Sequence, residues 1–261
     1  MIPDLGRFFD ELGRWADAAR VPVTTHRYGP DAEHEADLRL PAGAGPFPVA
    51  VVLHGGFWQA EFTREIMSAV AVALTQAGWA TWNVEYRRVG AGGGIPQTLE
   101  DVHAAVPALE RFGVPFARSR PVAIGHSAGG HLALWLAATG SVGAAVGLAA
   151  VCDLAAAARE GLGGGAAVEL AGGLPEAVPE AYERADPITR LPTGVPQILV
   201  HGDRDDRVPV AQSRAYAERA RTTGDECELV ELRGAGHFEL IDSRTASWRA
   251  VEAALAKLRP R

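Results

Sequence analysis

The sequence has few of the residues on which disulfide-linked or nucleic-acid-binding proteins depend. Its 261 residues include only two cysteines, Cys152 and Cys227, and neither belongs to a C-x-x-C motif. A disulfide framework is therefore excluded, and a reducing compartment, the cytoplasm, is the simplest expectation. The net charge is −7 and the chain has no basic patch, so the sequence predicts no nucleic-acid partner and no anionic membrane surface.

Long apolar runs and metal-ligand clusters are absent from the sequence as well. The apolar stretch from Val142 to Val151 has only about half the length of a membrane-spanning helix. The N-terminus has no basic segment followed by an apolar core, so we expect no signal peptide. No His, Cys and Asp residues occur at metal-ligand spacing, and the Gly90 to Gly94 loop lacks the Lys-Ser/Thr of a phosphate-binding loop. We therefore expect no membrane partner, no cofactor and no metal.

The composition indicates a soluble globular protein with a sizeable core, because 48% of the residues are hydrophobic and 22% are charged. The length fits one large domain or two small ones, and we expect a single domain over residues 1–261. Apolar residues at helical spacing within 3–20, among them Phe8, Phe9 and Trp15, predict an amphipathic helix. We expect this helix to pack on the outside of the domain.

Apolar strand patterns alternate with helical patterns along the rest of the chain. The segments expected to form strands are 23–28, 35–40, 49–53, 79–86, 121–125, 143–151, 196–200 and 227–232. Between them, the longer segments expected to form helices are 61–77, 96–112, 209–222 and 243–258. This alternation predicts an α/β fold with a mostly parallel central sheet flanked by helices on both faces.

The stretch from Gly125 to Gly129 combines the end of a strand, the sequence G-x-S-x-G and the start of a helical pattern. This is the context of a nucleophile elbow, in which a tight turn exposes a serine hydroxyl above a helix N-terminus. Side chains two residues before and after Ser127 would collide with the neighbouring strand or helix, which explains the two glycines. The pattern therefore predicts that Ser127 is a nucleophile.

A serine nucleophile needs a base, and the base needs a carboxylate that orients it. In a fold of this kind the order along the chain is serine, acid and histidine. Downstream of Ser127, one strand pattern leads to three aspartates, Asp203, Asp205 and Asp206, and a later one leads to His237. The order fits a triad of Ser127, one of these aspartates and His237.

These motifs resemble those of the α/β-hydrolase superfamily over most of the chain, roughly from Val23 onward. The phrase H-G-x-x-D-x-x-V-P, from His201 to Pro209, matches the acid loop of that superfamily. The resemblance implies that Asp205 is the catalytic acid. Asp203 and Asp206 compete for this role, although aspartates in such loops more often make turn hydrogen bonds.

The sequence His-Gly-Gly-Phe-Trp at 54–58 resembles the oxyanion loop of kynurenine formamidases (arylformamidases) and of hormone-sensitive-lipase-like esterases. The aromatic pair after the glycines is closer to the formamidases. The resemblance implies an oxyanion hole made by backbone N–H groups of Gly56, Phe57 and Ala128. Gly55 could replace one of the two loop donors.

Two aromatic residues adjoin the expected catalytic positions. Trp58 follows the oxyanion loop and Phe238 follows the expected base. We expect both to line the substrate pocket, while a position in the core stays open for each. Among the histidines, His54 is expected to shape its loop through hydrogen bonds, and His126 and His131 are expected to be structural.

Together these features predict a cytoplasmic serine hydrolase that cleaves a small amide or ester through an acyl-enzyme intermediate. The resemblance implies an N-formyl aryl amide as one candidate substrate. A general short-chain carboxylesterase is the alternative, and a third hypothesis is a non-catalytic hydrolase-fold ligand receptor. We expect one helix near 179–184 and no large lid between the strands that end near 151 and start near 196. The sequence leaves the oligomeric state open, a homodimer included.

Overall fold

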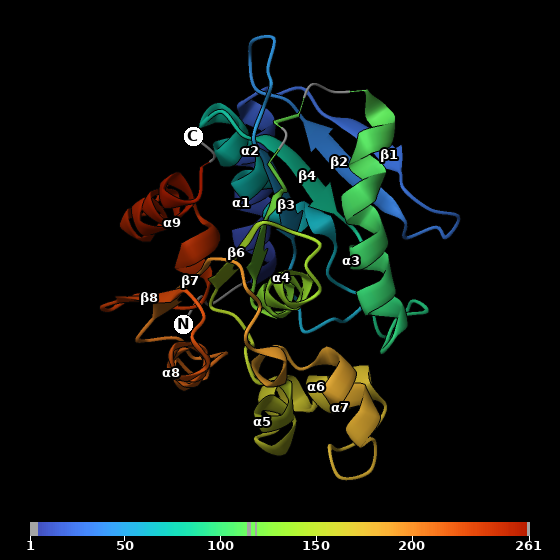
Figure 1. Ribbon diagram of the computed structural model, residues 1–261. Coiled ribbons are helices and arrows are strands. Elements are labelled where there is room, and N and C mark those ends of the chain that lie inside the picture. Colours follow the sequence, from blue (N-terminus) through green and yellow to red (C-terminus); the bar gives the residue numbers. More distant parts are fainter. Residues whose placement is uncertain (1–4, 114–115, 118, 260–261) are drawn as a thin grey trace.

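The computed structural model describes residues 5–113, 116–117 and 119–259 (Figure 1). Its strands are β1 (Thr24–Arg27), β2 (Glu35–Arg39), β3 (Val49–Leu53), β4 (Ala80–Val84), β5 (Val122–His126), β6 (Ala144–Leu148), β7 (Gln197–Gly202) and β8 (Cys227–Leu232). Its α-helices are α1 (Leu5–Ala18), α2 (Ser68–Gln76), α3 (Gln97–Ala108), α4 (Ala128–Ala138), α5 (Leu154–Arg159), α6 (Ala166–Ala171), α7 (Pro179–Ala185), α8 (Ala211–Thr223) and α9 (Ala246–Lys257). Short 3-10 helices are η1 (Arg64–Met67), η2 (Leu109–Phe112), η3 (Leu162–Gly164), η4 (Pro187–Arg190) and η5 (Phe238–Ile241).

All eight strands form one sheet in the order β1-β2-β4-β3-β5-β6-β7-β8. The pairs β1–β2 and β2–β4 are antiparallel, and all other neighbours are parallel. Every residue of β3 to β7 is buried, as expected of strands covered on both faces. The predicted α/β class with a mostly parallel sheet is therefore confirmed.

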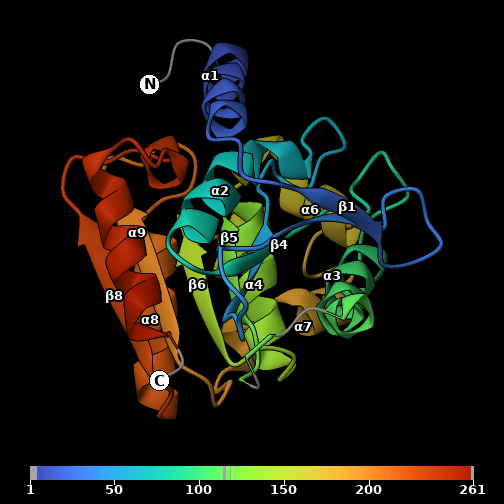
Figure 2. The same cartoon turned by 90° about the horizontal axis from the view of Figure 1, so that it is seen from above.

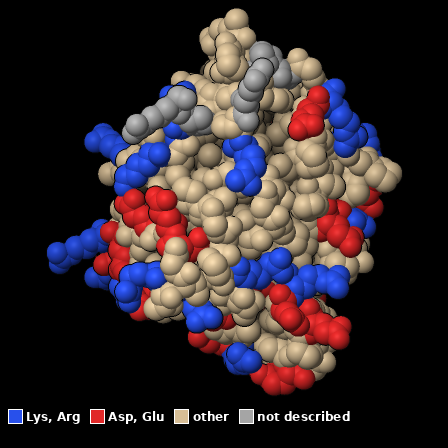
Figure 3. Space-filling view, viewed as in Figure 1, with Lys and Arg blue, Asp and Glu red and all other residues tan. Residues whose placement is uncertain are grey.

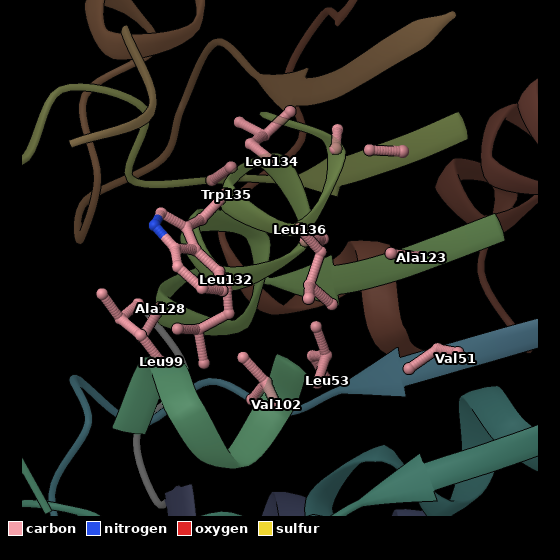
Figure 4. Close-up of a cluster of buried hydrophobic side chains, with 14 of the residues drawn as sticks. Val51, Leu53, Leu99, Val102, Ala123, Ala128, Leu132, Leu134, Trp135 and Leu136 are labelled. Carbon is pink, nitrogen blue, oxygen red and sulfur yellow. The ribbon is translucent and has the colours of Figure 1, made fainter. Parts of the chain in front are cut away.

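Successive residues of the central strands point into two different cores. In β3, Val49, Val51 and Leu53 belong to a cluster with residues of α3 and α4. Ala50 and Val52 belong to a second cluster with residues of α2 and α9. Figure 4 shows part of the first cluster, where side chains of α3 and α4 pack over β3 and β5. Because strand side chains alternate between faces, the apolar runs of the sequence cover the sheet with helices on both sides.

The N-terminal helix α1 packs on α2 at the outer edge of the molecule (Figure 2). Its Leu12 and Ala16 are buried in the same cluster as α2. The aromatic side chains of Phe8, Phe9 and Trp15 are partly buried against that cluster. The helix thus buries one face and leaves the other in solvent, as its amphipathic pattern predicts.

The surface carries charges of both signs. On the face shown in Figure 3, acidic and basic side chains are intermixed, and no continuous basic area forms there. Within the part of the chain that the structure describes, none of the helices combines the length and the hydrophobicity that a membrane span requires.

The segment between β6 and β7 contains more helices than the sequence predicts. The sequence predicts a single helix near 179–184, whereas the structure has three, α5, α6 and α7, grouped below α4 in Figure 1. Their buried side chains, such as Ala157, Leu170 and Ala185, belong to the same cluster as those of α4. The segment therefore extends the main core instead of building the separate core of a large lid.

The sequence shows no clear helical pattern for α5 and α6, because both helices are short and the turn between them is rich in glycine. The turn from Gly161 to Gly165 contains four glycines with φ between 61° and 96°, and α5 and α6 have only six residues each. Helices this short depend on tertiary contacts. At the end of α7, Nε2–H of His131 donates to Ala185 O (2.9 Å) and Nε1–H of Trp135 donates to Arg184 O (2.8 Å). Contacts with α4 therefore fix the group.

Stability should depend on the protonation of Asp186, which joins α5 to the end of α7. Its carboxylate is buried and accepts from the N–H groups of Leu154 (2.9 Å) and Ala155 (3.0 Å). Burial raises the pKa of Asp186 to about 7, although these hydrogen bonds favour the charged form. The unfolded carboxyl has a pKa of about 3.9. Since the folded value is higher, this group contributes stability below about pH 4 that is lost as pH rises through about 7.

The test is urea unfolding of the wild type and Asp186→Asn at pH 5 and pH 8. We expect the free energy of unfolding of the wild type, relative to the variant, to be lower at pH 8 than at pH 5. The amide keeps an acceptor oxygen for one of the two N–H groups and does not titrate, so the pH dependence of the difference, not its size at one pH, tests the assignment. An equal difference at both values of pH would contradict the assignment.

Candidate active site

The G-x-S-x-G segment forms a tight turn between β5 and α4. Ser127 has φ 56° and ψ −118°, a conformation that is strained for a residue with a side chain. A Cβ at Gly125 would lie 2.0 Å from Gly129 O, and a Cβ at Gly129 would lie 2.2 Å from Leu53 O. These contacts are shorter than any real Cβ tolerates, so the turn requires glycine at both positions. The backbone has the geometry expected of a nucleophile elbow.

The structure brings one of the three candidate aspartates to His237. Asp205 Oδ2 accepts from Nδ1–H of His237 at 2.7 Å, and both side chains are almost completely buried. Asp203 instead accepts from the N–H of Gly234 at 2.6 Å and is exposed. The exposed Asp206 faces the Arg207 guanidinium at 3.6 Å.

Hydrogen bonds keep the Asp205 carboxylate charged. Burial alone would raise the pKa of Asp205, but hydrogen bonds from His201, His237 and the N–H of Val208 hold it well below its usual range. Its Oδ1 accepts from the N–H groups of Arg207 and Val208, each at 2.8 Å. The carboxylate is therefore ionised and fixed in orientation, as the acid of a triad must be.

Ser127 and His237 line one cavity of about 340 Å³. His126 lines the same cavity, its Nε2–H donates to His237 O at 3.0 Å, and the two imidazole rings lie 4.5 Å apart. Burial lowers the pKa of His126 to about 3, so its ring is neutral. Among the described residues the Ser127 hydroxyl makes no hydrogen bond with His237. Such bonds are often long in enzymes without substrate and shorten in the reacting complex.

The loop after β3 is held by buried polar contacts of His54. Its Nδ1 lies 2.8 Å from Gly55 O and its Nε2 lies 2.8 Å from Glu85 Oε1. The Tyr86 ring stacks on the imidazole at 4.3 Å, and its hydroxyl donates to His54 O at 2.8 Å. Burial would raise the pKa of Glu85, but His54 and then Arg88 hold it below its usual range. With both nitrogens engaged, His54 shapes the loop and is not free to exchange a proton with a substrate.

The same loop presents backbone donors near Ser127. A Cβ at Gly55 would lie 2.9 Å from His126 O, so the loop rests directly on the elbow. Gly56 and Phe57 line the cavity that contains Ser127. None of the candidate donors has an acceptor among the residues that the structure describes; they are the N–H groups of Gly55, Gly56, Phe57 and Ala128. The position fits an oxyanion hole and leaves the choice between Gly55 and Gly56 open.

The position of the Trp58 side chain differs from the one that the sequence predicts. The side chain is only 1% exposed, lies in the core and contacts the His131 ring edge to face at 5.2 Å. The prediction that it lines the pocket is therefore wrong. Phe57 and Trp58 both have positive φ (51° and 57°), and this turn sends Phe57 to the cavity and Trp58 to the core. Sequence position alone does not reveal a turn of this kind.

Phe238 lines the cavity, as expected, and segments far away in the sequence complete the walls. Sequence reasoning missed seven of these residues: Leu5, Phe9, Glu61, Phe62, Ile66, Gly163 and Arg207. From α1, the Phe9 ring contacts Phe238 at 5.7 Å and Phe62 at 6.4 Å. Phe8 of the same helix also contacts the Phe238 ring, at 5.8 Å, and no local pattern in the sequence indicates that this helix reaches the cavity.

The described residues contain no group of three or more His, Cys, Asp or Glu side chains that could hold a metal ion. The arrangement instead contains the parts of a nucleophilic mechanism. It has a serine on a strained turn, a buried carboxylate–imidazole pair beside the same cavity, and backbone donors without acceptors.

Comparisons with known proteins place this arrangement among the α/β-hydrolases. Residues 36–219 match the BD-FAE protein family. Esterase LipC of Mycobacterium tuberculosis is 30% identical over 248 residues, which cover 82% of this chain and 59% of LipC. The chain thus spans about 59% of the length of this curated relative.

Solved structures share the fold at low sequence identity. A truncated carbohydrate esterase from gut microbiota has a TM-score of 0.77 and 20% identity, covering 90% of this chain and 95% of that one. Esterase B of Lactobacillus rhamnosis has a TM-score of 0.75 and 19% identity, covering 97% and 92%. Esterase 2 of Thermogutta terrifontis has a TM-score of 0.73 and 20% identity, covering 93% and 97%. Because the family match spans most of the chain and these structures share its fold, the chain belongs to the BD-FAE family within the α/β-hydrolase superfamily.

Proposed function

We propose that the protein is a carboxylesterase that hydrolyses esters of small molecules, with Ser127 as nucleophile, His237 as base and Asp205 as acid. The observation that carries this proposal is the 2.7 Å bond between Asp205 and His237 beside the cavity that contains the elbow serine. The relative LipC is named an esterase, which supports the reaction type.

The reaction follows from the positions of these groups. Asp205 accepts Nδ1–H of His237, so Nε2 carries the lone pair that removes the Ser127 proton. Ser127 Oγ then attacks the ester carbonyl, and N–H groups of Gly56, Phe57 and Ala128 stabilise the oxyanion. His237 returns the proton to the leaving alcohol, which leaves an acyl-enzyme on Ser127. The same histidine then activates water to release the acid.

The cavity favours short acyl groups. Its aromatic walls, Phe9, Phe57, Phe62 and Phe238, enclose a volume of only about 340 Å³. Thermogutta terrifontis esterase 2 has been solved with propionate and with butyrate bound, and we transfer a preference for short acids to this chain.

A second candidate reaction is the hydrolysis of an N-formyl aryl amide. The observation that favours it is the position of Phe57, which follows the loop glycines and lines the cavity as an aromatic wall. Aromatic stacking of about 0.5–1.5 kcal/mol could then hold an aryl leaving group. Both cysteines are unpaired, which supports the further proposal of a cytoplasmic location.

Ser127→Ala should abolish ester hydrolysis while the fold is retained. Loss of a triad nucleophile typically lowers kcat by about 10⁶-fold. The measurement is kcat on p-nitrophenyl acetate together with labelling by a fluorophosphonate probe, which tests the non-catalytic receptor hypothesis as well. Ser119→Ala, at an exposed serine outside the cavity, is the matched control and should keep both signals. Hydrolysis within tenfold of wild type in folded Ser127→Ala would refute the mechanism.

Asp205→Asn should lower kcat far more than Asp203→Asn. An amide can leave His237 in the wrong tautomer, and in a serine protease the equivalent change lowers kcat about 10⁴-fold. Asp203 only accepts from the Gly234 N–H at the surface, so its variant should stay within about tenfold of wild type. A larger loss at Asp203 than at Asp205 would reassign the acid.

Phe9→Ala should widen the range of chain lengths that the enzyme accepts. A neighbouring groove of about 750 Å³ shares Leu5, Phe9 and Phe62 with the cavity, so removing the Phe9 ring should join the two spaces. We expect the octanoate-to-acetate ratio of kcat/KM to rise about tenfold, since each buried methylene contributes about 0.8 kcal/mol. Phe8→Ala is the control, because it removes a ring that also contacts Phe238, at 5.8 Å, but does not itself line the cavity.

Two series of substrates are measured, because either the acyl side or the alcohol side of the ester can face α1. p-Nitrophenyl acetate, butyrate and octanoate vary the acyl group, and acetates of longer alcohols vary the leaving group. If Phe8→Ala changes kcat/KM in both series as much as Phe9→Ala does, α1 affects the cavity only by packing on the domain, and the Phe9 ring does not select chain length. N-formylkynurenine in the same panel decides between the ester and formamide reactions.

A further inference from the structure

The Asp205 carboxylate contacts a second imidazole besides that of His237. His201 lies at the carboxyl end of β7, and its Nε2 is 3.2 Å from Asp205 Oδ2. The same oxygen accepts from His237 Nδ1 at 2.7 Å. The mechanism above gives His201 no role, although its side chain is fully buried beside the acid.

The neighbours of His201 fix the position of its proton. Besides Asp205, Nε2 faces the carbonyl oxygen of Val208 at 2.9 Å. Both neighbours are acceptors, so Nε2 carries a hydrogen, which it donates to Val208 O with Asp205 Oδ2 beside it at 3.2 Å. On the other side of the ring, Nδ1 lies 2.7 Å from the Ser213 hydroxyl, which can donate to it. Nε2 of His201 thus carries a hydrogen, and the Ser213 hydroxyl is the partner of Nδ1.

This chain of contacts connects the acid to the rigid core. Ser213 is fully buried on α8, and its hydroxyl lies 3.9 Å from the buried Cys152 thiol. The loop that carries Asp205 is less well enclosed, because Asp203, Arg204 and Asp206 on either side of it are exposed. Without His201, the orientation of the carboxylate would depend on the loop's own backbone donors and on His237.

We propose that His201 is a positioning residue that holds Asp205 Oδ2 in place for His237 and shares its negative charge. The inference rests on the triad of the proposed function. Hydrogen bonds to a buried charge are among the stronger ones in proteins, and groups that orient a reacting group commonly affect rates about 10- to 100-fold. Ser213 takes part as the hydrogen-bond partner of His201 Nδ1.

The test compares His201→Leu with His201→Gln. Leucine has a comparable volume and no donor, whereas the glutamine amide can place an N–H near the former position of Nε2. The matched control is His34→Leu, which removes another buried histidine from a carboxylate, Asp101, at 2.8 Å and away from the cavity. Folded fractions are compared by circular dichroism before rates are measured.

Three readouts separate positioning from loss of fold. We expect His201→Leu to lower kcat/KM on p-nitrophenyl acetate by about 10- to 100-fold. We also expect the acid limb of its pH profile to move to higher pH, because more of the Asp205 charge then acts on His237 alone. The other titratable or charged groups near this pair are His126, whose ring lies 4.5 Å from that of His237, and Glu61 and Arg207, which line the same cavity. His201→Gln should recover most of the rate and return the acid limb toward its original position.

The rate of Ser127 labelling by a fluorophosphonate is the third readout and needs no ester turnover. If the wild type is labelled but hydrolyses no ester, the proposed function fails, and the labelling rates of the variants still test His201. The proposal is overturned if His201→Leu, per folded molecule, reacts as fast as His34→Leu. It is also overturned if glutamine restores nothing or if the acid limb stays in place.

Discussion

A steric constraint at the elbow determines the positions of the other parts of the site. The main chains of β3, β5 and α4 approach so closely that a Cβ at Gly129 would lie 2.2 Å from Leu53 O and 2.4 Å from His54 O. The contact places the strained Ser127 backbone and the loop that starts at His54 against each other. Ser127, the candidate nucleophile, and the candidate oxyanion donors therefore take their relative position from one backbone contact, and small rearrangements of either would disturb both.

Buried histidines make hydrogen bonds at the strand ends that carry the candidate site. His54 holds its loop through Glu85, His126 donates to the carbonyl of His237, and His201 lies between Asp205 and Ser213. A buried polar group without a partner would cost about a few kcal/mol of stability. Each of these hydrogen bonds therefore disfavours other conformations of the strand end that carries the histidine. Of these, His126 contacts His237 directly, and His201 contacts its partner Asp205.

The walls of the cavity come from parts of the chain that are remote from the triad. α1 supplies Leu5 and Phe9, and the turn before α6 supplies Gly163, against which the Phe57 ring packs. The side chain of Gln59 donates to Glu169 on α6 at 2.5 Å and joins the oxyanion loop to the helices after β6. These segments can change the shape of the cavity without altering the groups that carry the reaction, which fits a fold that supports many substrates.

The sequence by itself determined the parts that local patterns encode. Apolar runs predicted the strands, and Gly125 and Gly129 predicted the elbow. The order along the chain left three aspartates open, and the resemblance of the 201–209 phrase to the acid loop of the α/β-hydrolases singled out Asp205, which the structure joins to His237 at 2.7 Å. Only the tertiary structure decided that Trp58 enters the core, that α1 lines the cavity, that α5 and α6 form, and that His201 reaches Asp205. The reason is that these features depend on packing, which no local pattern contains. Packing decides the direction of a side chain after a turn at positive φ, the folding of six-residue helices and the contacts between distant segments.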